Sequence, residues 1–188
     1  MPDHETTEPL HPARDYGPLL ESLYALPDAA GREVRMRAVV DAVWEAFGSR
    51  TIPHEPGRPY SWIGFYERPR RADGTDADEM ILLERRDTPA CSPIGLHGMC
   101  GRSCLDVRPI LVADVRTLGE GYVACDPKDQ SEIVIPLLRP DGSCWGVLDG
   151  DSFDLNAFTA YDVAGLLAMA EAAKLTSPGL TPAETLVL

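Results

Sequence analysis

The first quarter of the chain carries apolar residues at helical spacing. Residues 16–26 show this pattern weakly and residues 32–48 show it clearly, so both segments are predicted helices. Gly48 is well suited to end the second helix. The apolar positions of that helix are Met36, Val40, Val43, Trp44 and Phe47. Residues 49–59 hold three prolines and a glycine, which predicts a loop.

From residue 60 the chain changes to short runs rich in β-branched and aromatic residues. These predicted strands are residues 60–67, 80–84, 108–114, 132–138 and 143–151. The pair Asp141–Gly142 between the last two runs indicates a hairpin. Residues 159–174 return to helical spacing, and Thr159 with Asp162 resembles a capping box. The order of elements predicts an α+β fold, an antiparallel sheet with helices packed on its faces.

The length of 188 residues suits a single domain. We expect residues 1–15 to form a flexible leader, because they are polar and without period. Residues 16–175 then form the domain, including its N-terminal helices. Residues 176–188 form a C-terminal tail that we expect to be irregular.

The chain is strongly acidic, which limits its partners. Lys and Arg number 17 against 30 Asp and Glu, a net charge of −13. This charge repels phosphate backbones and anionic lipids, so neither nucleic acid nor a membrane is an expected partner. The N-terminal residues lack the apolar segment of a secretory signal, so we expect a cytoplasmic protein. The odd count of 5 cysteines then argues against a disulfide scaffold and for redox, nucleophilic or metal-binding thiols.

Two cysteines lie in settings that suggest chemistry. Cys100 is flanked by glycines, and a helix that starts near Gly98 would lower the pKa of its thiol. His97, Cys100 and Cys104 have the spacing to face one metal ion, but zinc usually takes four ligands, which the chain does not obviously supply. Cys125 lies in a polar loop that leads into a strand, which is an unusual place for a packing residue.

Three carboxylates are predicted to converge at one end of the hairpin. Glu132 opens the strand 132–138, and Asp149 and Asp151 close the strand 143–151 on one face. Their mutual repulsion would raise one pKa and keep a carboxyl protonated near neutral pH, where it can act as an acid. The alternatives are a solvated strand end or a site for a hard cation.

Two aromatic residues also share a face of their strand. Trp62 and Tyr66 are four positions apart, with Gly64 between them on the same side. The glycine would leave room for a ligand between the two rings. Packing of both rings in the core is the alternative interpretation.

Four segments together resemble a known family. In chain order they read SWIGFYE, ACSPIGLHGMCG, YVACDPKDQSEIVIPL and GVLDGDS. In this order and spacing they resemble the GAF domain, and more narrowly the free methionine-(R)-sulfoxide reductases, which are stand-alone GAF proteins. The resemblance covers about residues 60–170.

The resemblance implies roles for three cysteines. Cys125 matches the catalytic cysteine, Cys91 the resolving cysteine and Cys100 a third cysteine of the family. Whether Cys91 or Cys100 resolves the intermediate stays open, because the stretch between them is shorter than usual and residues 84–89 depart from the family pattern. Cys104 and Cys144 match no functional cysteine and are expected to be packing residues.

The resemblance also assigns the pocket. Trp62 and Tyr66 match its aromatic residues, and Glu132, Asp149 and Asp151 match its carboxylates. Which carboxyl would donate a proton is left open.

The activity that the resemblance implies is the reduction of free L-methionine-(R)-sulfoxide, a defence against oxidative stress. Cys125 would become a sulfenic acid, Cys91 would form a disulfide with it, and thioredoxin would reduce that disulfide. No metal and no organic cofactor is expected. A homodimer is a candidate assembly, since dimers are common in this fold. The rival hypotheses are a non-enzymatic GAF module that binds a small molecule as a sensor, and an enzyme that keeps the pocket but fails to recycle.

Overall fold

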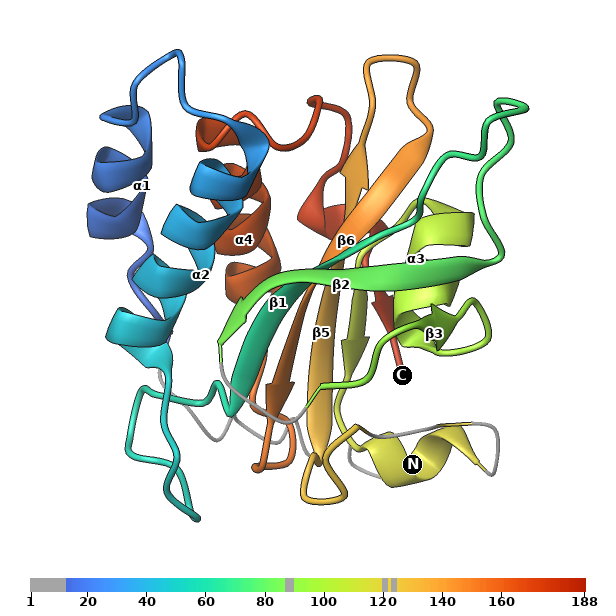
Figure 1. The fold of residues 1–188 in the computed structure, drawn as a ribbon. Helices are drawn as coiled ribbons and strands as arrows, with labels where there is room; N and C mark the ends of the chain where they lie inside the picture. The colour runs from blue at the N-terminus through green and yellow to red at the C-terminus, as the bar shows by residue number, and fades with distance from the viewer. Residues whose placement is uncertain (1–12, 87–89, 120–121, 123–124) are drawn as a thin grey trace.

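A seven-stranded sheet with helices on both faces organises the chain (Figure 1). The structure is a computed structural model that describes residues 13–86, 90–119, 122 and 125–188. The strands are β1 (Trp62–Glu67), β2 (Glu79–Arg86), β3 (Ile94–Gly95), β4 (Ile110–Val112), β5 (Ser131–Leu138), β6 (Cys144–Ser152) and β7 (Leu186–Val187). The helices are α1 (Gly17–Tyr24), α2 (Arg32–Phe47), α3 (Met99–Asp106) and α4 (Ala160–Ala172). The spatial order of the strands is β3-β2-β1-β6-β5-β4-β7.

Helices α1, α2 and α4 cover one face of the sheet, and α3 covers the other (Figure 1). Alternation along the strands divides the apolar residues between two cores. On β1, Ile63 and Phe65 join the core under α1, α2 and α4, whereas Trp62 and Tyr66 join the core under α3. The predicted α+β class is confirmed, and the α3 side of the sheet is the side that carries the predicted pocket residues.

The predicted hairpin and helix boundaries are confirmed. Strands β5 and β6 pair antiparallel, and their turn is closed by the Arg139 N–H, which donates to the Ser143 carbonyl at 2.8 Å. Gly142 has a φ of 82°, a conformation that favours glycine. Helix α4 begins with the capping box of Thr159 and Asp162.

The C-terminal segment differs from the predicted irregular tail. Strand β7 pairs with β4 in parallel, with Leu186 beside Ile110 and Val187 beside Leu111. The Leu188 carbonyl continues this pairing by accepting a hydrogen bond from the Ala113 N–H at 2.9 Å. The sheet is therefore mixed rather than wholly antiparallel. A two-residue strand is too short to show a period, which is why the pattern missed it.

The end of the predicted leader belongs to the folded domain. Residues 1–12 lie outside the described residues. Arg14 is buried, and its Nε donates to Asp162 Oδ1 at 2.6 Å. The Tyr16 hydroxyl donates to the same carboxylate oxygen at 2.9 Å. These contacts fasten the segment before α1 to the first turn of α4. Within the part of the chain that the structure describes, no helix is long and apolar enough to cross a bilayer.

Candidate active site

A cavity of about 300 Å³ lies between the α3 side of the sheet and the segments that cover it. Strands β1, β5 and β6 supply one wall, and β3, the start of α3 and the loops around Cys91 and Cys125 supply the others. The lining includes all eight predicted site residues, namely Trp62, Tyr66, Cys91, Cys100, Cys125, Glu132, Asp149 and Asp151. The fold therefore gathers into one cavity side chains that the sequence spreads over 90 positions.

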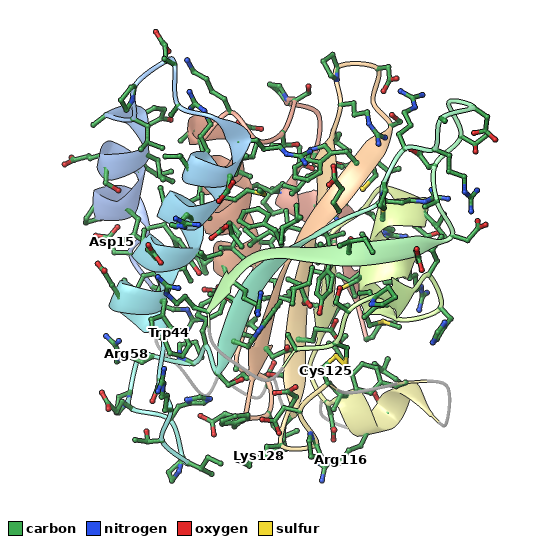
Figure 2. All side chains as sticks on the ribbon, in the orientation of Figure 1. Asp15, Trp44, Arg58, Arg116, Cys125 and Lys128 are labelled. Carbon is green, nitrogen blue, oxygen red and sulfur yellow. A yellow bond between two sulfur atoms is a disulfide. The ribbon has the colours of Figure 1, made fainter. Side chains whose placement is uncertain are left out.

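Cys91 and Cys125, the second of which is labelled in Figure 2, are joined by a disulfide, and both residues line this cavity. Their Cα atoms are 5.6 Å apart, within the range that a disulfide bridges. The Tyr66 hydroxyl donates to the Cys91 carbonyl at 2.9 Å and holds the Cys91 loop against β1. The short stretch between Cys91 and Cys100 thus does not keep Cys91 away from Cys125.

Cys100 is buried near the start of α3, and the predicted lowering of its pKa is wrong. Its thiol donates to Asp149 Oδ2 at 3.2 Å. Burial raises the pKa of the Cys100 thiol well above its usual value, and the charges of Asp149 and Glu132 raise it further. A partial charge at the helix start is outweighed by desolvation and two nearby carboxylates.

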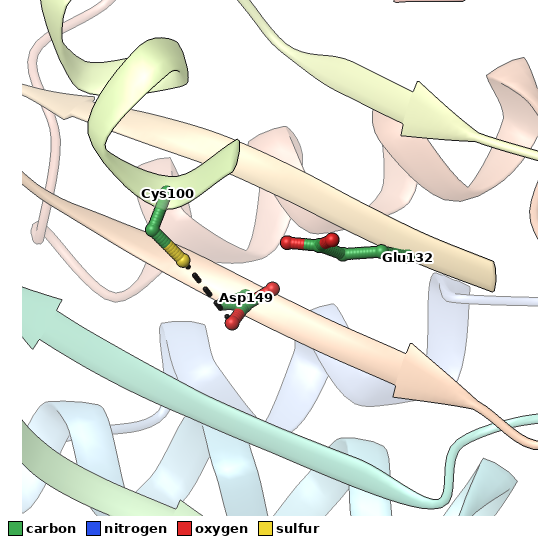
Figure 3. A group of neighbouring side chains, drawn as sticks. All are labelled: Cys100, Glu132 and Asp149. Carbon is green, nitrogen blue, oxygen red and sulfur yellow. Dashed lines mark hydrogen bonds between the residues drawn. The ribbon is translucent and has the colours of Figure 1, made fainter. Parts of the chain in front are cut away.

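The other two free cysteines pack behind α3. Cys104 and Cys144 are buried, and the Cys144 thiol donates to the Gly146 carbonyl at 3.0 Å. This agrees with the packing role that the sequence suggested. The grouping of His97, Cys100 and Cys104 around a metal is not found among the described residues. Instead, Cys100 lies with Glu132 and Asp149, and their potential ligand atoms are all within 4.8 Å of one another (Figure 3).

The three carboxylates converge as the hairpin predicted. Glu132 on β5 is the direct cross-strand partner of Asp151 on β6, and Asp149 lies two residues along on the same face. Glu132 and Asp149 are 5% and 6% exposed, whereas Asp151 is half-buried. A solvated strand end is therefore excluded for Glu132 and Asp149.

Burial dominates the electrostatics of these carboxyls. It raises the pKa of Asp149 to about 7. Burial also raises the pKa of Glu132 and of Asp151 well above their usual ranges, and the charge of Asp149 adds to both. Mutual repulsion, the predicted cause, comes second to desolvation, because the cavity removes water from all three groups.

The two aromatic side chains line the wall next to the carboxylates. Trp62 pairs with Asp151 and Gly64 pairs with Asp149 across β1 and β6. The rings of Trp62 and Tyr66 lie 5.9 Å apart between centroids. A Cβ at Gly64 would stand 2.5 Å from the indole of Trp62. The space that the glycine leaves is filled by Trp62 itself, so the expectation of a ligand at that point is wrong.

Among the lining residues that the sequence reasoning did not assign to a site, two carry titratable side chains, Asp129 and Tyr122. Asp129 is buried and accepts hydrogen bonds from the Ser61 hydroxyl at 3.4 Å and from the Asp126 N–H at 3.3 Å. Burial, followed by the charge of Asp126, raises the pKa of Asp129 to about 7. Burial, followed by the charge of Glu132, raises the pKa of the Tyr122 hydroxyl above its usual value. Neither residue belongs to a periodic segment, and closeness to Cys125 in the chain is the only signal that pointed to them.

Solved structures with this fold include free methionine-R-sulfoxide reductases and other GAF domains. The X-ray structure of free methionine-R-sulfoxide reductase from Neisseria meningitidis, in complex with its substrate, superimposes with a TM-score of 0.71 and 28% identity, over 89% of this chain and 93% of that one. Protein YtsP of Bacillus subtilis is 32% identical over 84% of this chain and 88% of its own length. The chain belongs to the GAF-domain family that includes the free methionine-R-sulfoxide reductases.

Membership of this family confirms the resemblance drawn from the four sequence segments. Free methionine-R-sulfoxide reductase of Saccharomyces cerevisiae is 30% identical over 64% of this chain, and the match spans 61% of the yeast protein's length. No family model matches the chain. The structure of a GAF domain superimposes on this chain with a TM-score of 0.71 and 26% identity, over 87% of this chain and 90% of that one. The residues that match the family's site line the cavity on the α3 side.

Proposed function

We propose that this protein reduces free L-methionine-(R)-sulfoxide to L-methionine. The observation that carries the proposal is the bonded pair Cys91–Cys125 lining the same cavity as the three carboxylates and Trp62. Similarity to proteins named free methionine-R-sulfoxide reductase supports it. Neither observation depends on the other.

The cavity suits a small zwitterion with a cationic end. The Glu132, Asp149 and Asp151 carboxylates are positioned for an ammonium group, and the indole of Trp62 supplies an apolar wall for the S-methyl group. A cavity of about 300 Å³ holds a free amino acid, whereas a peptide would have to leave it on both sides of the residue. We therefore expect selectivity for free over peptide-bound methionine sulfoxide.

In the first step Cys125, freed from its disulfide, attacks the sulfoxide sulfur as a thiolate. The S–O bond of the substrate breaks and the oxygen ends on Cys125 as a sulfenic acid, while methionine leaves. The substrate sulfur gains two electrons and the Cys125 sulfur loses two. The oxygen needs a proton as its bond to sulfur breaks, and Asp149 or Asp151 is the donor in this scheme.

In the second step the Cys91 thiol attacks the sulfenic acid, which gives the Cys91–Cys125 disulfide and one water. An external dithiol, for which we propose thioredoxin, then reduces that disulfide through a mixed disulfide and is itself oxidised by two electrons. Cys100 is the alternative resolving thiol. Its burial and its hydrogen bond to Asp149 favour Cys91 for this step.

The proposed cycle needs a compartment with a reducing dithiol. We place the protein in the cytoplasm for this reason, since thioredoxin keeps thiols reduced there. The presence of three free cysteines beside the disulfide agrees with such a setting. A homodimer and a role in oxidative stress remain parts of the proposal, to be measured by light scattering and by survival of oxidant-treated cells.

The decisive assay follows NADPH consumption with thioredoxin, thioredoxin reductase and free L-methionine-(R)-sulfoxide. Turnover with the R epimer, and none with the S epimer or with a peptide that contains methionine sulfoxide, is the expected result. Binding of the R epimer without any methionine release would instead favour the GAF sensor hypothesis. One methionine released per protein chain without turnover would identify an enzyme that fails to recycle with this reductant.

A further inference from the structure

The proposed cycle leaves Cys100 without a step when Cys91 resolves the sulfenic acid. Cys100 nevertheless has a well-defined position beside two carboxylates. Helix α3 brings its sulfur to a carboxylate from β5 and another from β6, and the Cys100 Sγ and one oxygen each of Glu132 and Asp149 lie within 4.8 Å of one another (Figure 3). A thiol and two carboxylates from three different elements thus point into one space.

Two oxygens of this cluster have no hydrogen-bond partner among the described residues, Glu132 Oε2 and Asp149 Oδ1. Both side chains are more than nine-tenths buried, at 5% and 6% exposure. Leaving a buried carboxylate oxygen unpaired costs free energy, so both atoms are arranged for something that enters the cavity. A cation satisfies them both at once.

We infer that Cys100, Glu132 and Asp149 form a site for a borderline divalent cation such as Zn²⁺, bound through the Cys100 sulfur and the two carboxylates, with a fourth position open to the cavity. Zinc bonds of about 2.0 Å to oxygen and 2.3 Å to sulfur place tetrahedral ligands about 3.3–3.8 Å apart. The Cys100 Sγ and Asp149 Oδ2 already lie 3.2 Å apart. All three ligand atoms lie within 4.8 Å of one another, close to the spacing of the ligands of a tetrahedral zinc ion.

The sulfur sets the class of cation. Two carboxylates alone would suit Mg²⁺ or Ca²⁺, which take oxygen ligands. A thiolate beside them shifts the preference to Zn²⁺ and Co²⁺, which accept sulfur. On binding, the cation replaces the proton that the Cys100 thiol shares with Asp149, and that proton leaves to solvent.

Such a cation would bind reversibly and inhibit the enzyme, and it would not be a cofactor of the reaction. It occupies the carboxylates that the proposed function assigns to the substrate's ammonium group, so cation and substrate exclude each other. This consequence rests on the proposed function, whereas the cation site itself does not. Bound Zn²⁺ would therefore inhibit the enzyme in competition with its substrate.

The test uses Co²⁺ as a spectroscopic probe on the disulfide form of the protein. The disulfide removes the thiols of Cys91 and Cys125, so that Cys100, Cys104 and Cys144 are the thiols left. We expect a near-ultraviolet band from thiolate-to-cobalt charge transfer and the visible bands of a tetrahedral ion, at one equivalent of Co²⁺. Addition of Zn²⁺ should remove both sets of bands.

Two variants decide the assignment. Cys100→Ala should lose the charge-transfer band, whereas the matched control Cys104→Ala, a buried cysteine one turn along α3, should keep it. A band that survives in Cys100→Ala, or that disappears in Cys104→Ala instead, overturns the site. Failure of the wild-type protein to bind Co²⁺ at millimolar concentration also overturns it.

A second variant covers the event that Cys100→Ala does not fold. Asp149→Asn keeps the shape of the side chain and removes one ligand charge, so Zn²⁺ affinity measured by competition with a chromophoric chelator should fall at least tenfold. Unchanged affinity would contradict the proposal. In the coupled assay, Zn²⁺ should raise the KM for methionine sulfoxide and leave kcat unchanged. Cobalt bands without any catalytic activity would retain the cation site and reject the proposed function.

Discussion

The hydroxyl of Tyr66 on β1 donates to the backbone carbonyl of Cys91, 2.9 Å away, and so ties the pocket wall to the loop that carries Cys91, the proposed resolving cysteine. Tyr66 was predicted only as an aromatic residue of the pocket. In the structure it also limits how far Cys91 can move from Cys125.

Tyr66→Phe should slow disulfide formation and spare methionine release. The substitution keeps the ring and removes a hydrogen bond worth about 1 kcal/mol, which corresponds to roughly a fivefold lower rate of disulfide formation. Quenched-flow measurement of both products in a single turnover separates the two steps. Equal slowing of both would show that the hydroxyl acts on the substrate instead.

Cys125→Ser should abolish even one turnover. A hydroxyl is far less ionised than a thiol at neutral pH, so it cannot take the sulfoxide oxygen. The measurement is methionine released from one equivalent of substrate. Cys144→Ser serves as the matched control, since Cys144 is buried and lies outside the cavity lining, and this variant should turn over nearly normally. Stoichiometric methionine from Cys125→Ser would remove it as the nucleophile.

Cys91→Ser should release about one methionine per chain and then stall. The first step needs only Cys125 and the pocket, while the second needs a thiol to condense with the sulfenic acid. Mass spectrometry after blocking free thiols should find the Cys91–Cys125 link in the wild-type protein. A Cys100–Cys125 link together with steady turnover of the variant would transfer the resolving role to Cys100.

Glu132→Gln, Asp149→Asn and Asp151→Asn should each lower kcat/KM for the free sulfoxide. Each variant removes a charge that faces the ammonium group or a proton for the oxygen, and an acid–base contribution is typically ~10²–10⁴-fold. Separate values of KM and kcat identify the proton donor, because the variant that lacks the proton donor should have a lower kcat. Near wild-type efficiency in all three variants would show that the cluster takes no part in catalysis.

Asp129→Asn should flatten the dependence of stability on pH. The folded protein raises the pKa of Asp129 from the usual 3.8 to about 7, so the folded state holds this proton more tightly than the unfolded chain does. This contribution to stability is therefore fully present below about pH 4 and is lost as the pH rises through 7, and its full size is on the order of 4 kcal/mol. Urea unfolding at pH 5 and pH 8 measures it. A wild-type protein that is more stable at pH 8 than at pH 5, by a margin that the variant shares, would contradict the assignment.

The sequence predicted best what depends on periodicity. Alternation placed Trp62 and Tyr66 on one face, and the Asp141–Gly142 turn set the register that brings Glu132 to Asp151. Both rest on local rules that hold without knowledge of the rest of the fold. The family resemblance added the cysteine roles, which no spacing rule could assign.

What the sequence missed depends on burial and on distant partners. The thiol of Cys100 was expected to ionise readily, but two carboxylates from β5 and β6 and the loss of water reverse the direction of its pKa shift. Arg14 was predicted to belong to a flexible leader, because its partner Asp162 is 148 residues away in the sequence and no local pattern connects the two. Asp129 lies in a loop without a period, so only its position in the folded cavity identifies it.

The Cys91–Cys125 disulfide closes a segment with a sequence separation of 34, and that segment contains β3, α3 and β4. A disulfide that closes a loop of this size lowers the conformational entropy of the unfolded chain. In the chain-entropy account this raises the free energy of unfolding by about 4 kcal/mol. Every catalytic cycle would therefore alternate between a tighter, heat-resistant form and a looser form whose pocket cover opens more readily. The melting temperature then reports the redox state of the protein. The reduced form, which would receive the substrate, is the form whose pocket cover opens more often.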